Sequence, residues 1–360
     1  MTINNNHLAF LALLKAGLWE EEVQLSQFGE LDFEFIHRLA QEQSVVGLIT
    51  AGLEHVIDVD IPRKVALTFA SSVMQIETRN IAMNNFIAEL FGKMNGSGIH
   101  ALLIKGQGIA QCYSRPLWRA AGDVDLLLDS DNFEKASLLL TPMAKKTEDV
   151  RPQTKHYALT IGQWEVELHG TLRSLLTKRI DRVIDEVQND TFINKKNRLW
   201  YNGENSVLLP SPNNDVIFVF VHILQHYFRW GIGLRQICDW CRLLYTYKSI
   251  IDSQLLEERL SRMGIKTEWY AFAYLAVNTL GMPSQSMSLY SSDKKWEIKS
   301  NRILSFVFYV GNFGQNRDYS YYIKYPYLVH KAISLWRHSC DSLKHLFVFP
   351  LDTLKMWGKW

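Results

Sequence analysis

Gly122-Asp123-Val124-Asp125-Leu126-Leu127-Leu128 predicts a β-strand that carries two carboxylates near its start. Side chains two residues apart lie on the same face of a strand, roughly 7 Å apart along it. Asp123 and Asp125 therefore share one face, while Val124 and Leu126 point to the opposite face and into a core. Two neighbouring carboxylates repel each other unless a cation lies between them, and Mg²⁺ commonly binds one or two carboxylates together with substrate phosphates. This strand is therefore a candidate metal site.

A shorter strand is expected just upstream, and it ends in a glycine turn. An apolar run over 99–104 gives way to Lys105-Gly106-Gln107-Gly108. Glycine commonly stops a strand, and it lets the backbone approach a ligand closely. The turn is therefore a candidate phosphate site opposite the two aspartates.

A third carboxylate is expected on a strand further along the chain. In the segment 163–170, polar and apolar residues alternate, so that Glu165, Glu167 and His169 share one face. If this strand lies next to the first, Glu167 is brought beside Asp123 and Asp125. Three carboxylates on adjacent strands, opposite a glycine turn, suit a two-metal phosphoryl or nucleotidyl transfer.

Together these motifs resemble the polymerase β-like nucleotidyltransferases, whose pattern is a strand, a Gly-Ser or related turn, a helix and Asp-x-Asp. They are more similar to a bacterial branch of uncharacterised nucleotidyltransferases with Lys-Gly in the turn, a later Tyr, Arg-x-x-Gly-Asp-hydrophobic-Asp and a distal acidic-Leu-His. The matching residues are Lys105-Gly106, Tyr113, Arg119-Ala120-Ala121-Gly122-Asp123-Val124-Asp125 and Glu167-Leu168-His169. The serine that usually follows the turn glycine is absent, because Gln107 follows Gly106.

The resemblance implies a role for each matching residue. Asp123 and Asp125 would bind Mg²⁺ or Mn²⁺, and Glu167 would be the third carboxylate, which binds metal and activates the acceptor. The proposed nucleotide-binding residues, which would hold an NTP (ATP by default), are Lys105, Gly106, Gln107, Arg119 and Gly122. We therefore expect a metal-dependent enzyme that moves an NMP group to a hydroxyl or phosphate of an unidentified small-molecule or protein acceptor and releases pyrophosphate.

Two other functions stay open at this point. The missing serine is compatible with a non-catalytic nucleotide-binding or regulatory module on the same fold. A glycosyltransferase would also use Asp-x-Asp to hold a metal-bound sugar nucleotide. A glycosyltransferase needs a nucleotide-binding βαβ half upstream of this motif, where this sequence instead predicts helices.

Apolar spacing predicts an α+β fold, in which helical regions flank a small mixed sheet. The expected domains are a helical N-terminal region over 1–97, a nucleotidyltransferase-like core over 98–210 and a helical C-terminal domain over 211–360. Two hairpins are expected, pairing 157–161 with 164–168 and 198–201 with 206–209. Helices are expected over 7–18, 33–43, 62–95, 172–187, 214–228, 234–247, 253–263, 267–280, 294–313 and 327–347.

The C-terminal region contains a second polar cluster, around the turn Trp230-Gly231-Ile232-Gly233. As a lid over the site, its helices would contact the nucleotide or the acceptor. Alternatively, they form a helix–helix interface in which Arg235 and Asp239, four residues apart, make a local ion pair. The candidate acceptor or lid contacts are His169, His222, His226, Arg235 and Asp239. The two imidazoles of His222 and His226 and the thiols of Cys238 and Cys241 also offer a set of zinc ligands, although free cysteine is among the most buried residue types.

Composition limits the class of protein. A chain of 360 residues with 47% hydrophobic content supports two or three packed domains and excludes disordered and fibrous proteins. A net charge of +2 argues against a nucleic-acid substrate, which usually needs a basic face. The N-terminus lacks the basic segment of a signal peptide, no apolar run reaches the roughly 18 residues that span a bilayer, and the cysteines show no regular framework. We expect a cytoplasmic protein, whose oligomeric state the sequence leaves open.

Overall fold

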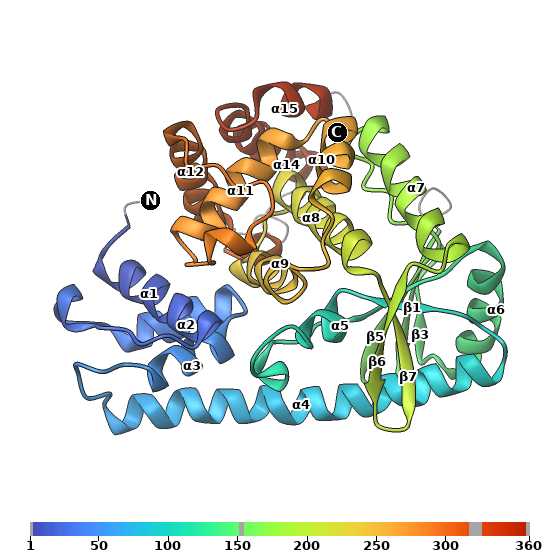
Figure 1. Ribbon diagram of the computed structural model, residues 1–360, viewed down its shortest axis with the longest axis horizontal. Helices are drawn as coiled ribbons and strands as arrows, with labels where there is room; N and C mark the ends of the chain where they lie inside the picture. The colour runs from blue at the N-terminus through green and yellow to red at the C-terminus, as the bar shows by residue number, and fades with distance from the viewer. Residues whose placement is uncertain (1–2, 151–154, 317–325, 358–360) are drawn as a thin grey trace.

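A five-stranded mixed sheet lies beside a larger helical region in the computed structural model, which describes residues 3–150, 155–316 and 326–357 (Figure 1). The strands are β1 (Leu102–Ile104), β2 (Val124–Leu127), β3 (Lys146–Thr147), β4 (His156–Ile161) and β5 (Trp164–His169). Their order across the sheet is β1-β2-β5-β4-β3. Strand β2 pairs antiparallel with β1 and parallel with β5, so it lies inside the sheet with neighbours on both sides. The expected α+β class with a small mixed sheet is confirmed.

One face of the sheet is apolar and is covered by helices α4 (Arg63–Gly96) and α6 (Ser130–Leu140). Leu126 of β2 and Leu168 of β5 are fully buried in the same cluster as side chains of both helices. Because side chains alternate along a strand, the residues that come directly before and after each of these leucines face the other side of the sheet. That second face of β2 and β5 carries the acidic residues.

The N-terminal layer consists of α1 (Asn5–Trp19), α2 (Phe33–Glu42) and α3 (Val46–Glu54), and α4 runs from this layer along the sheet (Figure 1). Helix α3 was not expected from the sequence. It packs very closely on α1: a Cβ at Gly52 would lie 2.0 Å from the backbone oxygen of Leu13. Glycine lowers helix propensity, so this helix depends on a tertiary contact that local spacing does not show.

The second expected hairpin is present as β6 (Asn197–Asn202) and β7 (Asn205–Pro210), which pair antiparallel. The remaining helices are α5 (Gly106–Ala110), α7 (Lys178–Ile193), α8 (Pro212–Arg229), α9 (Leu234–Thr246), α10 (Ser253–Met263), α11 (Lys266–Asn278), α12 (Lys294–Val310), α14 (Tyr327–Leu346) and α15 (Pro350–Trp357). Most match the expected helices within a few residues. The helix expected over 172–187 begins later, because Asp181 accepts hydrogen bonds from the backbone of Ser174 and Leu175 and holds that segment in a loop.

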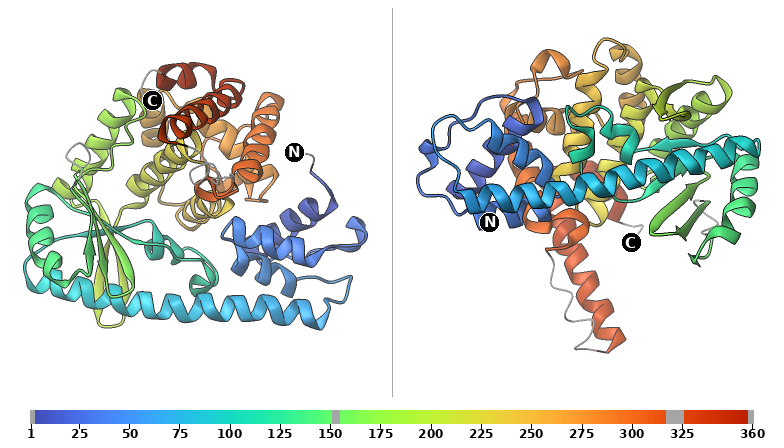
Figure 2. Two further views of the ribbon diagram at one scale, coloured as in Figure 1. Left: turned by 180° about the vertical axis from the view of Figure 1, so that it is seen from behind. Right: turned by 90° about the horizontal axis from the view of Figure 1, so that it is seen from below.

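The helical C-terminal part packs above the sheet and the N-terminal layer, and α14 projects away from the body of the protein (Figure 2). A single buried cluster includes Leu14 of α1, Leu127 of β2 and Phe220 of α8. The three regions expected from the sequence thus share a core, and their division into domains stays a prediction. No helix within the described ranges combines the length and the apolar character needed to cross a membrane.

Candidate functional site

The pairing of β2 with β5 brings the three expected metal ligands together. Asp125 lies directly opposite Glu167 in the parallel register, and Asp123 lies on the same face of the strand. One carboxylate oxygen from each of the three residues lies within 4.8 Å of the others. Oxygens bound to Mg²⁺ at about 2.1 Å in an octahedron lie roughly 3 Å apart, so small side-chain shifts would let these three share an ion.

Asp125 is the buried centre of the cluster, with 4% of its surface exposed. Its Oδ1 accepts hydrogen bonds from Lys105 Nζ at 3.1 Å and from His169 Nε2 at 2.8 Å. Burial alone would raise the pKa of Asp125, but Lys105 and His169 outweigh it and hold the pKa below its usual value. Asp125 is therefore ionised at neutral pH.

The other two acids differ in their environments. Asp123 lies at the exposed edge of the cluster, and the charge of Asp125 raises its pKa. Glu167 is partly buried, which opposes its ionisation, yet hydrogen bonds from His156 and His169 bring its pKa well below the usual value. A divalent cation would relieve the repulsion between the carboxylates of Asp123 and Asp125.

The turn before α5 faces the acidic strand. Lys105 has a φ of 57° and Gly106 a φ of 43°, both in the left-handed region, and a Cβ at Gly106 would lie 3.4 Å from the backbone oxygen of Asp123. Burial opposes the charge of Lys105, but Asp125, Asp123 and Glu167 outweigh it and raise the Lys105 pKa. Lys105 is the cation of the expected set that contacts the cluster directly.

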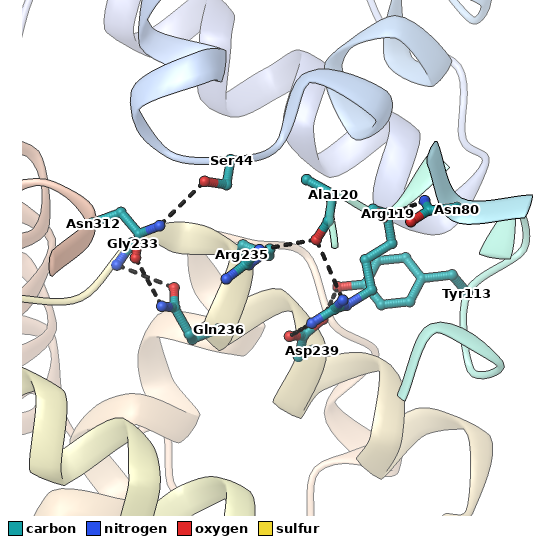
Figure 3. Close-up of polar contacts among 10 residues, drawn as sticks. All are labelled: Ser44, Asn80, Tyr113, Arg119, Ala120, Gly233, Arg235, Gln236, Asp239 and Asn312. Carbon is teal, nitrogen blue, oxygen red and sulfur yellow. Dashed lines mark hydrogen bonds and ion pairs between the residues drawn. The ribbon is translucent and has the colours of Figure 1, made fainter. Parts of the chain in front are cut away.

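Gln107 and Arg119, both expected to bind nucleotide, donate instead to groups inside the protein. Gln107 is 2% exposed, and its Nε2 donates to Asn80 Oδ1 at 2.8 Å. Arg119 is 6% exposed, and its Nε and Nη2 each lie 2.7 Å from a carboxylate oxygen of Asp239 (Figure 3). Gly122 has no heavy atom within 4 Å of the position a Cβ would take. Of these three, only Gly122 lies in open space.

The local ion pair between Arg235 and Asp239, one of the two alternatives for this region, is replaced by longer-range contacts (Figure 3). Asp239 also accepts from Tyr113 Oη at 2.7 Å, and Arg235 Nη1 donates to the backbone oxygen of Ala120 at 2.9 Å. Arg119 displaces the local pair because it offers two parallel N–H groups to one carboxylate in a buried setting. Helix α9 is thereby bonded to the segment that leads into β2.

The turn at Gly233 is bonded to distant parts of the chain (Figure 3). Its N–H donates to Gln236 Oε1 at 3.2 Å, and Gln236 Nε2 donates to Asn312 Oδ1 at 2.8 Å. Asn312 Nδ2 then donates to Ser44 Oγ at 3.2 Å. These contacts connect the start of α9 to the residues after α12 and to the turn between α2 and α3.

The rings of His222 and His226 of α8 meet edge to face, with their centroids 4.3 Å apart. Burial, and next the nearby charge of Lys105, lower both pKa values, that of His226 to about 3. Both imidazoles are therefore neutral at neutral pH. Cys238 and Cys241 are fully buried, and in the described part of the chain the four residues do not form a set of ligand atoms close enough to hold an ion.

One side chain at the cluster lies outside the set expected from the sequence. His156 Nε2 lies 3.0 Å from Glu167 Oε2, and His156 lies opposite His169 at the end of the β4–β5 hairpin. The hairpin register expected from the sequence already indicated this position of His156. Extending the expected pairing of 157–161 with 164–168 by one position at its open end places these two histidines side by side.

The chain is similar to a family of known proteins and to a solved structure. A family model described as an uncharacterised nucleotidyltransferase matches residues 29–281, which is more than half of the chain. The crystal structure of an antigenic nucleotidyltransferase-like protein from Paracoccidioides brasiliensis is similar over 57% of this chain and 92% of that chain, with 15% identity and a TM-score of 0.32. No curated protein matches the chain.

Proposed function

We propose, from the premise that this chain belongs to the family of uncharacterised nucleotidyltransferases, that it transfers a nucleoside monophosphate from an NTP to an acceptor hydroxyl or phosphate. The observation that carries the proposal is the meeting of Asp123, Asp125 and Glu167 beside the Lys105-Gly106 turn. ATP as the donor and membership of the polymerase β-like superfamily are part of this proposal. The motif Asp123-Val124-Asp125 and its pairing with β5 support the superfamily, and ATP is taken as the donor by default.

The donor atoms of the site fit Mg²⁺ or Mn²⁺. Asp123, Asp125 and Glu167 offer only carboxylate oxygens, which are the ligands that these ions prefer. When bound, the ions would neutralise the polyphosphate and lower the pKa of the acceptor hydroxyl.

The other groups of the cluster would bind and orient the substrates. Lys105, which is charged and lies against Asp125, would contact the phosphates, and the exposed backbone of Gly122 and the turn at Gly106 would let them approach. Glu167, whose pKa is held low, stays ionised and would orient the acceptor hydroxyl. A hydroxyl acceptor releases its proton to solvent. The acceptor oxygen then forms a bond to the α-phosphorus, the bond from that phosphorus to its bridging oxygen breaks, and pyrophosphate leaves.

Gln107 and Arg119 are proposed to act by positioning the site. Asn80, which is fully buried, accepts from Gln107 and donates to the backbone oxygens of Leu117 and Arg119. Arg119 in turn is held by Asp239. This set of bonds fixes the turn and the start of β2 relative to each other, which supports precise placement of Asp123 and Lys105.

Nucleotide turnover tests the proposal directly. The protein is incubated with Mg²⁺ and each α-labelled NTP, alone and with pools of small-molecule and protein acceptors, and pyrophosphate and labelled products are measured. Wild-type protein should release pyrophosphate and the Asp125→Asn variant should not. The alternative, a nucleotide-binding module, is favoured by the absence of serine after Gly106. Calorimetry that shows Mg²⁺-dependent NTP binding, without turnover in any pool, would establish the module instead.

A further inference from the structure

Two imidazoles lie beside one carboxylate on the polar face of the sheet. His156 Nε2 lies 3.0 Å from Glu167 Oε2, and His169 Nε2 lies 3.4 Å from the same oxygen. The two histidines come from paired strands, β4 and β5, and their ring centroids are 5.0 Å apart. His169 Nε2 also lies 2.8 Å from Asp125 Oδ1, so both rings lie against the acidic cluster.

The spacing of these atoms is that of a metal site. One ligand atom from each of His156, Glu167 and His169 lies within 4.8 Å of the others. Ligands bound to a tetrahedral ion at about 2.1 Å lie roughly 3.4 Å apart. The observed contacts are 3.4 Å, which equals that separation, and 3.0 Å, which is slightly shorter, so an ion could enter after a small outward movement of the rings.

We propose that His156, Glu167 and His169 form a second cation site that takes a transition ion of the zinc class, beside the Mg²⁺ site of Asp123, Asp125 and Glu167. Imidazole nitrogen favours zinc, copper, iron and nickel, whereas Mg²⁺ favours oxygen ligands alone. The two sites share Glu167 and differ in their other ligands. The protein is thus built to hold two unlike metals.

The surroundings suit an ion that enters from solvent. The side chains of His156 and His169 are 13% and 12% exposed, and that of Glu167 is 29% exposed. The ligand atoms can be reached, yet they are largely removed from water, which strengthens their attraction for a cation. A carboxylate that bridges two ions about 3.5–4 Å apart is the usual arrangement of two-metal enzymes. The inference deepens the proposed function by adding an unlike ion beside the Mg²⁺ site, and the second site can be tested without turnover.

Cobalt binding in the presence of Mg²⁺ tests this site. Metal-free, full-length protein is titrated with Co²⁺ in excess Mg²⁺, and the visible absorption of Co²⁺ is recorded. We expect one equivalent of Co²⁺ that Mg²⁺ does not displace, with the strong absorption of a four- or five-coordinate ion. His156→Gln and His169→Gln should each lower the Co²⁺ affinity about tenfold or more. Asp123→Asn should keep the absorption and weaken Mg²⁺ binding.

The matched control is His100→Gln, which changes an exposed histidine before β1 and should leave Co²⁺ binding as in the wild type. Circular dichroism shows whether each variant is folded. If a variant does not fold, X-ray absorption of the wild-type Co²⁺ protein decides, because imidazole scattering identifies histidine ligands without any substitution. Complete displacement of Co²⁺ by Mg²⁺, unchanged affinity in folded His156→Gln and His169→Gln, or absence of imidazole scattering would each overturn the inference.

Failure of the second site and failure of the proposed function give different results. Turnover in Mg²⁺ that is lost in Asp125→Asn, with no histidine-bound Co²⁺, leaves the proposed function standing and removes the second site. Histidine-bound Co²⁺ in a protein that binds no nucleotide supports the second site and contradicts the proposed function.

Discussion

Arg119 and Asp239, which lie on either side of the acidic strand in sequence, form a buried ion pair with two contacts of 2.7 Å. The pair joins helix α9 to the segment that enters β2. Two residues that the sequence assigned to substrate contacts are therefore bonded to each other, and the acidic cluster is held in place by helices far away in the chain.

Removing one partner of this pair should destabilise the protein strongly. Asp239→Asn leaves the guanidinium of Arg119 buried without a full counter-charge, and Arg119→Met leaves the Asp239 carboxylate in the same state. Loss of one partner of a buried pair costs about 3–5 kcal/mol. Urea unfolding would measure it. The exposed pair Arg38–Glu42 is the control, since Arg38→Met should change stability by less than about 1 kcal/mol. Equal losses in both pairs would contradict a special role for the buried one.

Asp123→Asn and Asp125→Asn should each abolish NMP transfer, because a neutral amide replaces a metal-binding charge. We expect a loss of at least about a hundredfold in kcat/KM while the circular dichroism spectrum stays that of the wild type. Glu165→Gln provides a matched control on the same face of β5, since Glu165 is exposed and accepts a hydrogen bond from Thr160. Full activity in either aspartate variant would remove the proposed metal site.

Lys105→Met should affect metal and nucleotide in opposite directions. Lys105 Nζ lies 3.1 Å from Asp125 and competes with a cation for that carboxylate, so its removal should tighten Mg²⁺ binding to the nucleotide-free protein by about tenfold. The same change removes a positive charge from the phosphate site, so NTP should bind more weakly. Calorimetry of Mg²⁺ alone and of Mg-NTP separates the two effects. If the affinities for Mg²⁺ and for Mg-NTP changed in the same direction, the proposed position of Lys105 between the metal site and the phosphates would be wrong.

His226 should make stability depend on pH in the acid range. Burial lowers its pKa in the folded state to about 3, whereas an unfolded histidine has a pKa of about 6.5. The unfolded state therefore binds more protons between these values, so the free energy of unfolding falls as the pH drops below about 6.5, by up to about 1.4 kcal/mol per pH unit for this group. His226→Asn should flatten this dependence in urea unfolding between pH 7 and pH 5, and substitution of the exposed His100 by Asn should not. An unchanged slope in His226→Asn would contradict the assignment.

Of the four cysteines, Cys340 should be the one that reacts with Ellman's reagent in the folded protein. Burial raises the pKa of Cys112 to about 11 and raises those of Cys238 and Cys241 as well, so their reactive thiolate forms are scarce at pH 8. Cys340 is partly exposed. All four thiols should react after denaturation, and Cys340→Ser should leave the folded protein without a fast-reacting thiol. Rapid reaction of more than one thiol in the folded protein would show that at least one of Cys112, Cys238 and Cys241 is accessible, and would contradict this prediction.

Much of the secondary structure was accessible from local patterns. The alternation in Trp164–His169 and the spacing in Ser253–Met263 predicted a strand and a helix at the observed positions. Helix α3 was missed because Gly47 and Gly52 weaken the helical signal while allowing α1 and Trp118 to approach the backbone closely. The start of α7 was predicted too early in the chain, because Asp181 accepts hydrogen bonds from the preceding backbone and keeps it in a loop.

The sequence by itself determined which side chains share a face: Asp123 with Asp125, and Glu167 with His169. This follows from the two-residue period of a strand, which is a local property of the chain. Only the tertiary structure decided that Asp125 lies opposite Glu167 and that Arg119 pairs with Asp239. Strand pairing and the choice of a buried counter-ion depend on how distant segments exclude water together, and no local period of the sequence records that outcome.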